Sequence, residues 1–142
     1  MDYEPVKFLI VDDDEVSIMK IKRAISKANL GNPVIVAMDG IEALEILRGD
    51  GGKDKLSHPY IVTLDINMPR MDGHQFLKEI RSDPVLQNVL VFVLTTSANE
   101  EDIAAAYEQH VAGYILKENS ENGLIEKISM IENFTNLVVL PK

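Results

Sequence analysis

Polar side chains that could carry phosphoryl or metal chemistry stand where the apolar runs of this sequence end. The run 61–64 stops at Asp65, and Met68-Pro69 then breaks the strand, because proline cannot donate to a sheet ladder. The other apolar runs end in the same way, on Asp12-Asp13-Asp14, Asp39, Thr95 and Lys117. Parallel strands bring their carboxyl ends to one edge of a sheet, where open α/β folds bind ligands. We therefore expect acids, a hydroxyl and an ammonium to meet there.

Carboxylates crowded at such an edge need either a proton or a cation between them. Two of them 4 Å apart repel by about 4 kcal/mol at an effective dielectric constant of about 20. Hard oxygen ligands of this kind suit Mg²⁺, and a lysine and a hydroxyl beside it suit a phosphoryl group. An aspartate there can itself act as nucleophile and form an acyl phosphate. The three histidines, His58, His74 and His110, lie in unrelated places and predict no metal cluster.

The elements that must position these groups alternate along the chain. Apolar runs predict strands over 6–11, 33–38, 61–64, 89–94 and 111–116. Amphipathic spacing predicts helices over 15–30, around 43–47, over 75–81, around 103–107 and from Ser120 to about Phe134. Strict alternation predicts a doubly wound parallel sheet with helices on both faces. We interpret 1–142 as one domain with a core at 6–134 and an apolar extension at 135–142.

Composition narrows the classes of partner. The chain has 142 residues, no cysteine and a formal charge of −9, with 46% hydrophobic residues. That balance disfavours nucleic acid and anionic membranes, which attract clustered Lys and Arg. No apolar run approaches the ~20 residues of a membrane span, and residues 1–5 do not form a signal peptide. A soluble cytoplasmic protein is the expectation.

The set Asp12-Asp13, Asp65 with Met68-Pro69-x-x-Asp72-Gly73, Thr95 and Lys117 resembles the receiver domain of two-component response regulators over about 6–134. The resemblance implies a flavodoxin-like fold with strand order 2-1-3-4-5. It also implies a signalling module that accepts a phosphoryl group from a histidine kinase and catalyses only its own phosphoryl transfer and autodephosphorylation. The sequences Thr95-Thr96-Ser97 and Glu100-Glu101-Asp102, together with Asn67 in the motif after the third predicted strand, resemble the matching sequences of receivers paired with bacterial phytochrome kinases.

The same resemblance implies a role for each matching residue. Asp65 would be the phosphoacceptor, and Thr95 and Lys117 would contact the phosphoryl oxygens. Mg²⁺ would be held by Asp13, by Asp12 directly or through water, by Asp65 and by the backbone carbonyl of Asn67. Tyr114 and Thr95 match the residues that switch with phosphorylation, and Asn67 and Ser97 match positions that tune how fast water removes the phosphate.

Several alternatives stay open at this stage. Asp14 reads as a helix N-terminal acid, and Thr96 and Ser97 compete with Thr95 for the place facing the phosphate. Glu118 replaces the proline usual after the lysine, and a cis non-proline bond costs about 3–4 kcal/mol, so we expect a trans bond there. The competing functions are a phosphate-independent interaction module and an aspartate-nucleophile phosphatase built on Asp12-x-Asp14.

The segment 136–141 is predicted to be a short strand after the last helix. It holds four β-prone apolar residues, Leu137 to Leu140, between a turn former and a proline. Leaving each in water would forgo roughly 1.5–3 kcal/mol. The segment would therefore pack on its own domain or exchange with a second copy in a homodimer. We favour the homodimer, with the fourth and fifth helices contributing.

Overall fold

The structure is a computed structural model that describes residues 4–28, 31–117 and 120–142. The expected trans bond at Glu118 lies outside the described residues. In chain order the elements are β1 (Lys7–Val11), α1 (Glu15–Lys27), β2 (Val34–Ala37), α2 (Gly40–Arg48), β3 (Tyr60–Leu64), α3 (Gly73–Ser82), β4 (Val91–Thr95), α4 (Glu100–Glu108), β5 (Gly113–Leu116) and α5 (Glu121–Leu137). All strand pairs are parallel and the sheet order is β2-β1-β3-β4-β5. The predicted fold class is confirmed.

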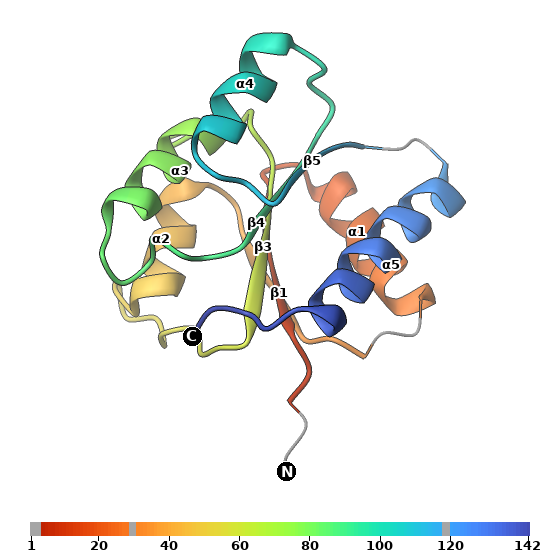
Figure 1. The fold of residues 1–142 in the computed structure, drawn as a ribbon, viewed down its shortest axis with the longest axis horizontal. Helices are drawn as coiled ribbons and strands as arrows, with labels where there is room; N and C mark the ends of the chain where they lie inside the picture. The colour runs from red at the N-terminus through yellow and green to blue at the C-terminus, as the bar shows by residue number, and fades with distance from the viewer. Residues whose placement is uncertain (1–3, 29–30, 118–119) are drawn as a thin grey trace.

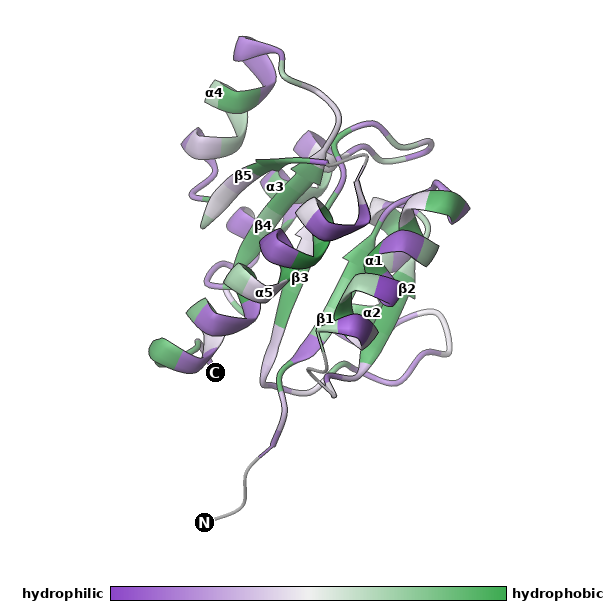
Figure 2. Cartoon of the chain, turned by 90° about the vertical axis from the view of Figure 1, so that its right-hand side faces the viewer, coloured by the Kyte–Doolittle hydropathy of each residue, from purple (hydrophilic) through white to green (hydrophobic). Residues whose placement is uncertain are grey.

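The sheet separates two hydrophobic cores. Figure 1 shows α1 and α5 on one face of the sheet and α2, α3 and α4 on the other. Side chains alternate along a strand, so Leu9 and Val11 pack under α2 and α3 while Phe8 and Ile10 pack under α1 and α5. The central strands are almost entirely apolar (Figure 2), as strands covered on both faces must be. Their rigidity fixes the polar residues at their ends.

Small polar residues begin each helix. Side-chain oxygens of the N-cap residues accept hydrogen bonds from backbone N–H groups of the first helical turn, which would otherwise lack partners. The helix predicted to start at Ser120 is capped by that residue, and the other N-caps are Asp14, Asp39, Asp72 and Asn99. At the start of α3, Gly73 lies so close to β3 that a Cβ atom there would be 2.6 Å from the Asp65 carbonyl oxygen. Only glycine lets α3 begin directly behind the end of the central strand.

The predicted strand at 136–141 is wrong. Helix α5 continues to Leu137, and Val138 is an extended C-cap. Hydrogen bonds from Thr135 and Asn136 to Glu132 hold the last helical turn. Residues beyond it line a hollow with Val6 and His58, beside the amino ends of β1 and β3. The open edges of the sheet are β2 and β5, whereas β1 and β3, beside which the tail lies, are interior strands.

Within the described residues, no helix has both the length and the apolar character that crossing a membrane requires.

Candidate functional site

Three carboxylates from two neighbouring strands meet at the carboxyl edge of the sheet. Asp12 and Asp13 follow β1 and Asp65 follows β3, and the Asp65 N–H donates to the Val11 carbonyl across the pair at 2.9 Å. One oxygen from each acid lies within 4.8 Å of the others. Asp12 and Asp65 are buried, at 1% and 9% exposure, whereas Asp13 faces solvent. This acidic cluster is where the sequence predicted the metal site, and none of the histidines belongs to it.

Lys117 supplies the positive charge beside the acidic cluster. Lys117 directly follows β5, and its backbone N–H donates to the carbonyl of Thr95 at the end of β4. The Lys117 ammonium lies 2.8 Å from Asp12 Oδ2 and 3.4 Å from Asp65 Oδ2, and it donates to Ser17 Oγ at 3.2 Å. Sequence reasoning missed Ser17, although its place in the first turn of the helix after the acids was a usable signal.

Burial and the neighbouring opposite charge act in opposite directions on the pKa of Lys117 and on the pKa of Asp12. Burial disfavours the Lys117 ammonium, but the hydrogen bond to Asp12 and the charges of Asp12 and Asp65 outweigh it and raise the pKa of Lys117. Burial raises the pKa of Asp12 by more than the Lys117 contact lowers it. Three carboxylates face one ammonium, so the ionised cluster carries a net charge of −2, which a divalent cation would neutralise. The oxygen donors and this charge fit Mg²⁺.

Asp14 is a helix cap, as the sequence suggested. Its side chain accepts from Val16 N at 3.1 Å and from Ser17 Oγ at 3.0 Å. Its backbone N–H donates to Asp12 Oδ1 at 2.9 Å, which orients the buried acid. Asp14 thus shapes the cluster without joining it.

Thr95, Thr96 and Ser97 occupy different environments. Thr95 is the last residue of β4 and is fully buried, whereas Thr96 is exposed and lines a small pocket beside Lys117. The Thr95 hydroxyl accepts from Ser97 N at 3.3 Å. The environments agree with the expected strand-end position of Thr95.

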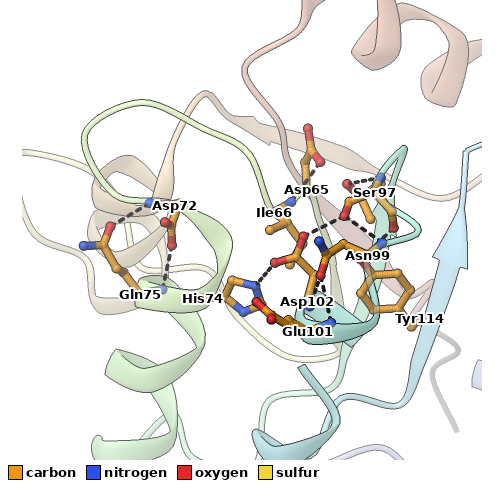
Figure 3. A network of polar contacts seen from close by, with 11 residues as sticks. Asp65, Ile66, Asp72, His74, Gln75, Ser97, Asn99, Glu101, Asp102 and Tyr114 are labelled. Atoms are coloured by element: carbon orange, nitrogen blue, oxygen red, sulfur yellow. Dashed lines mark hydrogen bonds and ion pairs between the residues drawn. The ribbon is translucent and has the colours of Figure 1, made fainter. Parts of the chain in front are cut away.

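Ser97 joins both expected switch residues to a polar network drawn in Figure 3. The Tyr114 hydroxyl donates to the Ser97 carbonyl at 2.8 Å, and the Ser97 hydroxyl donates to Asp102 Oδ2 at 2.6 Å. Asp102 Oδ1 lies 2.9 Å from His74 Nε2, at the start of α3. The hydrogen bonds from Ser97 and His74 hold the pKa of Asp102 below its usual range. Because the acid stands between serine and histidine, the histidine cannot activate the serine as a nucleophile.

His74 and Asp102 were not predicted as partners. They lie 28 residues apart on different helices. Only the packing of α3 against α4 brings them together.

The loop 66–72, which contains Asn67, follows Asp65 directly. Its base is closed by a hydrogen bond from Gly73 N to the Ile66 carbonyl at 2.8 Å. Ile66 N donates to Asp65 Oδ1 at 2.8 Å and so fixes one oxygen of that acid. Met68 and Met71 pack against the core under α2 and α3. Asn67 itself is exposed, directly beyond the strand end.

Fold and site together define a flavodoxin-like α/β protein with an acidic, lysine-containing site at the carboxyl edge of its sheet. The sequence matches the response regulator receiver domain over residues 8–129, and the chain belongs to this family. Response regulator Rcp1 of Synechocystis sp. is 33% identical over 138 residues, which span 96% of this chain and 94% of that protein. The receiver domain predicted from the sequence is confirmed.

Two solved structures are closely similar. The phosphorylated cyanobacterial phytochrome response regulator RcpA is 36% identical with a TM-score of 0.89, covering 98% of this chain and 100% of its own. The Mn²⁺-bound form of response regulator Rcp1 is 32% identical with a TM-score of 0.85, covering 97% of this chain and 100% of its own. A divalent cation is therefore bound by a near relative.

Proposed function

We propose that this receiver is a phosphorylation-controlled switch in which Asp65 accepts a phosphoryl group from a histidine kinase. The observation that carries the proposal is the meeting of Asp12, Asp13 and Asp65 with Lys117 at one edge of the sheet. Mg²⁺ would be held by the three acids and by the backbone carbonyl of Asn67, and when bound it would neutralise charge on the transferring group.

In the proposed reaction an Asp65 carboxylate oxygen attacks phosphorus. The new P–O bond forms as the P–N bond of the kinase phosphohistidine breaks, and the electron pair of that bond returns to the imidazole. Lys117 holds its positive charge beside Asp65 and offsets charge on the phosphoryl oxygens. Hydrolysis ends the signal when a water oxygen bonds to phosphorus and the acyl phosphate bond breaks. We propose no chemistry on other substrates.

The proposed switch runs from Thr95 to Tyr114. A phosphoryl group at Asp65 offers oxygens to the Thr95 hydroxyl, which now accepts from Ser97 N. The Ser97 carbonyl also accepts from the Tyr114 hydroxyl. A shift of Thr95 would therefore move Ser97 and change the hydrogen bond of Tyr114. Asp102 and His74 anchor Ser97 from α4 and α3. Phosphorylation would thereby alter the surface formed by α4 and β5.

The likeness to a phytochrome response regulator supports a bacterial phytochrome kinase as the proposed donor. Because such kinases draw their phosphate from ATP, we propose a cytoplasmic location. The acidic chain, at −9, gives no support for a nucleic acid or anionic membrane partner.

We further propose a homodimer formed through the end of α5 and the tail. Leu137 and Val139 are 84% and 95% exposed, and Met130 and Phe134 continue the apolar surface along α5. Residues 130, 134 and 137 have the spacing of one helix face. Leu140, in contrast, packs on the domain's own core. We propose a second copy of the chain as the partner of this apolar surface, because contact between apolar side chains does not place the charged side chains of two acidic chains against each other.

The dimer proposal predicts that the end of α5 is required for association. Light scattering should give the mass of a dimer for the full chain and of a monomer for a chain truncated after Phe134. Leu137→Lys with Val139→Lys should also give a monomer without shortening the chain, because both side chains are exposed and carry no core packing. A monomeric full chain, or dimers that survive both changes, would rule out this interface.

Phosphorylation itself separates the proposed switch from a phosphate-independent module. With acetyl phosphate and Mg²⁺, intact mass spectrometry should show one added phosphoryl group, and excess chelator should prevent it. Asp65→Asn should show none. A wild-type chain that never gains the mass would favour the phosphate-independent module, whereas turnover of a general phosphate ester would favour the phosphatase alternative.

A further inference from the structure

Asp39, at the carboxyl end of β2, is buried yet takes no part in the acidic cluster. It is 5% exposed, and its two oxygens have separate partners. Oδ1 accepts from Glu42 N at 2.9 Å and caps α2, while Oδ2 accepts from Arg70 Nε at 2.6 Å. Burial works to raise the pKa of Asp39, but the bonds from Arg70 and Glu42 outweigh it and lower the pKa. Asp39 is therefore a charged, buried anchor.

Arg70 belongs to the loop 66–72 and adopts an uncommon backbone conformation. Its φ is +61°, in the left-handed region that residues other than glycine and asparagine rarely occupy. Such a conformation persists only where the surroundings impose it, and it clusters at functional sites. The partner that holds the Arg70 side chain is Asp39, on an element outside the loop.

A second contact ties the same part of the loop to the start of α2. Gly40 N donates to the Met71 carbonyl at 3.1 Å. A Cβ at Gly40 would lie 2.7 Å from Met71 Cγ, so glycine is required for this approach. Two consecutive residues, Asp39 and Gly40, thus hold two consecutive loop residues, Arg70 and Met71. The loop is fixed at its base by Gly73 and at its far side by α2.

We propose that the Asp39–Arg70 ion pair positions loop 66–72, and with it the Asn67 carbonyl, for a divalent cation bound at Asp12, Asp13 and Asp65. Asp39 and Arg70 are positioning residues that act through the loop. The proposal rests on the proposed function, because it takes Asn67 as a metal ligand.

The test uses two variants that break the ion pair and change local charge in opposite senses. Asp39→Asn removes a negative charge but keeps a side chain that can cap α2. Arg70→Asn removes a positive charge but keeps a residue that tolerates the left-handed backbone. If charge alone mattered, the first would weaken Mg²⁺ binding and the second would strengthen it. If position matters, both should weaken it.

We expect isothermal titration calorimetry to show Mg²⁺ Kd raised about tenfold in both variants, the lower end of the loss caused by removing an outer-shell partner of a metal ligand. Arg48→Gln and Asp83→Asn are matched controls, because they break an ion pair of 3.2 Å that lies outside the loop. Both should keep the wild-type Kd. Unfolding in urea without metal separates the effect on Mg²⁺ from a loss of folded protein.

Opposite shifts of Kd in Asp39→Asn and Arg70→Asn, or no shift in either, would overturn the positioning role while leaving Mg²⁺ binding by wild type intact. A wild-type chain without Mg²⁺ binding, or an unchanged Mg²⁺ Kd in Asp13→Asn, would instead overturn the proposed function.

Discussion

Asp13→Asn should weaken Mg²⁺ binding and, at the same time, make the metal-free protein more stable. Loss of a direct ligand should raise Mg²⁺ Kd on the order of 100-fold, at least the effect of losing an outer-shell partner. Without metal, Asp13 adds to the repulsion among acids whose oxygens lie within 4.8 Å. Removing its charge should raise the free energy of unfolding by about 1 kcal/mol, the Coulomb energy of such a pair in a water-like dielectric.

Asp14→Asn is the matched control for Asp13. Asparagine can still cap α1, and the Asp14 side chain bonds to Val16 and Ser17 while only its backbone N–H, which the substitution keeps, donates to Asp12. Calorimetric titration should therefore show a far smaller change in Mg²⁺ Kd. Equal losses in the two variants would mean that overall negative charge, and not ligation by Asp13, attracts the cation.

Lys117→Met should destabilise the metal-free protein by about 3 kcal/mol, the usual cost of removing one partner of a buried ion pair. The Lys117 side chain is 13% exposed, and its loss would leave Asp12 and Asp65 buried without their cation. Mg²⁺ should restore more stability to this variant than to wild type, because it supplies the missing positive charge. Urea unfolding with and without Mg²⁺ measures both effects.

The pH dependence of the Lys117 effect follows from its raised pKa. A lysine with a higher pKa in the folded state contributes fully below the ordinary value of 10.5 and loses its contribution as pH rises through the folded value. The difference between wild type and Lys117→Met should thus persist through neutral pH and shrink as the pH rises into the alkaline range. Lys27→Met, which breaks a half-exposed pair with Glu121, should change stability little. A Lys117 variant as stable as this control would contradict the account.

Local sequence patterns predicted most of the fold and the site. Apolar runs ended by Asp12, Asp65 and Thr95 define strands that must share an edge once the sheet is parallel, so the acidic cluster followed from strand order. The helix capped by Ser120 was predicted in the same way. These signals are local, and parallel topology carries them into three dimensions without further information.

Contacts between distant elements were not predictable in this way. Pairing of His74 with Asp102, or of Arg70 with Asp39, depends on how helices and loops settle against the sheet. The prediction of a strand in the tail was wrong for a different reason. Leu137 to Leu140 has strand propensity, but α5 extends through Leu137 and the residues after it lie beside the interior strands β1 and β3, so tertiary context overrides local preference.

Trapping the acyl phosphate tests the central claim most directly. Borohydride reduces an aspartyl phosphate to homoserine, and peptide mapping then assigns the modified position. After treatment with acetyl phosphate and Mg²⁺, we expect homoserine at position 65 alone, with Asp12, Asp13 and Asp14 unmodified. Homoserine at any of those three acids, or its persistence in Asp65→Asn, would contradict the assignment of Asp65 as the phosphoacceptor.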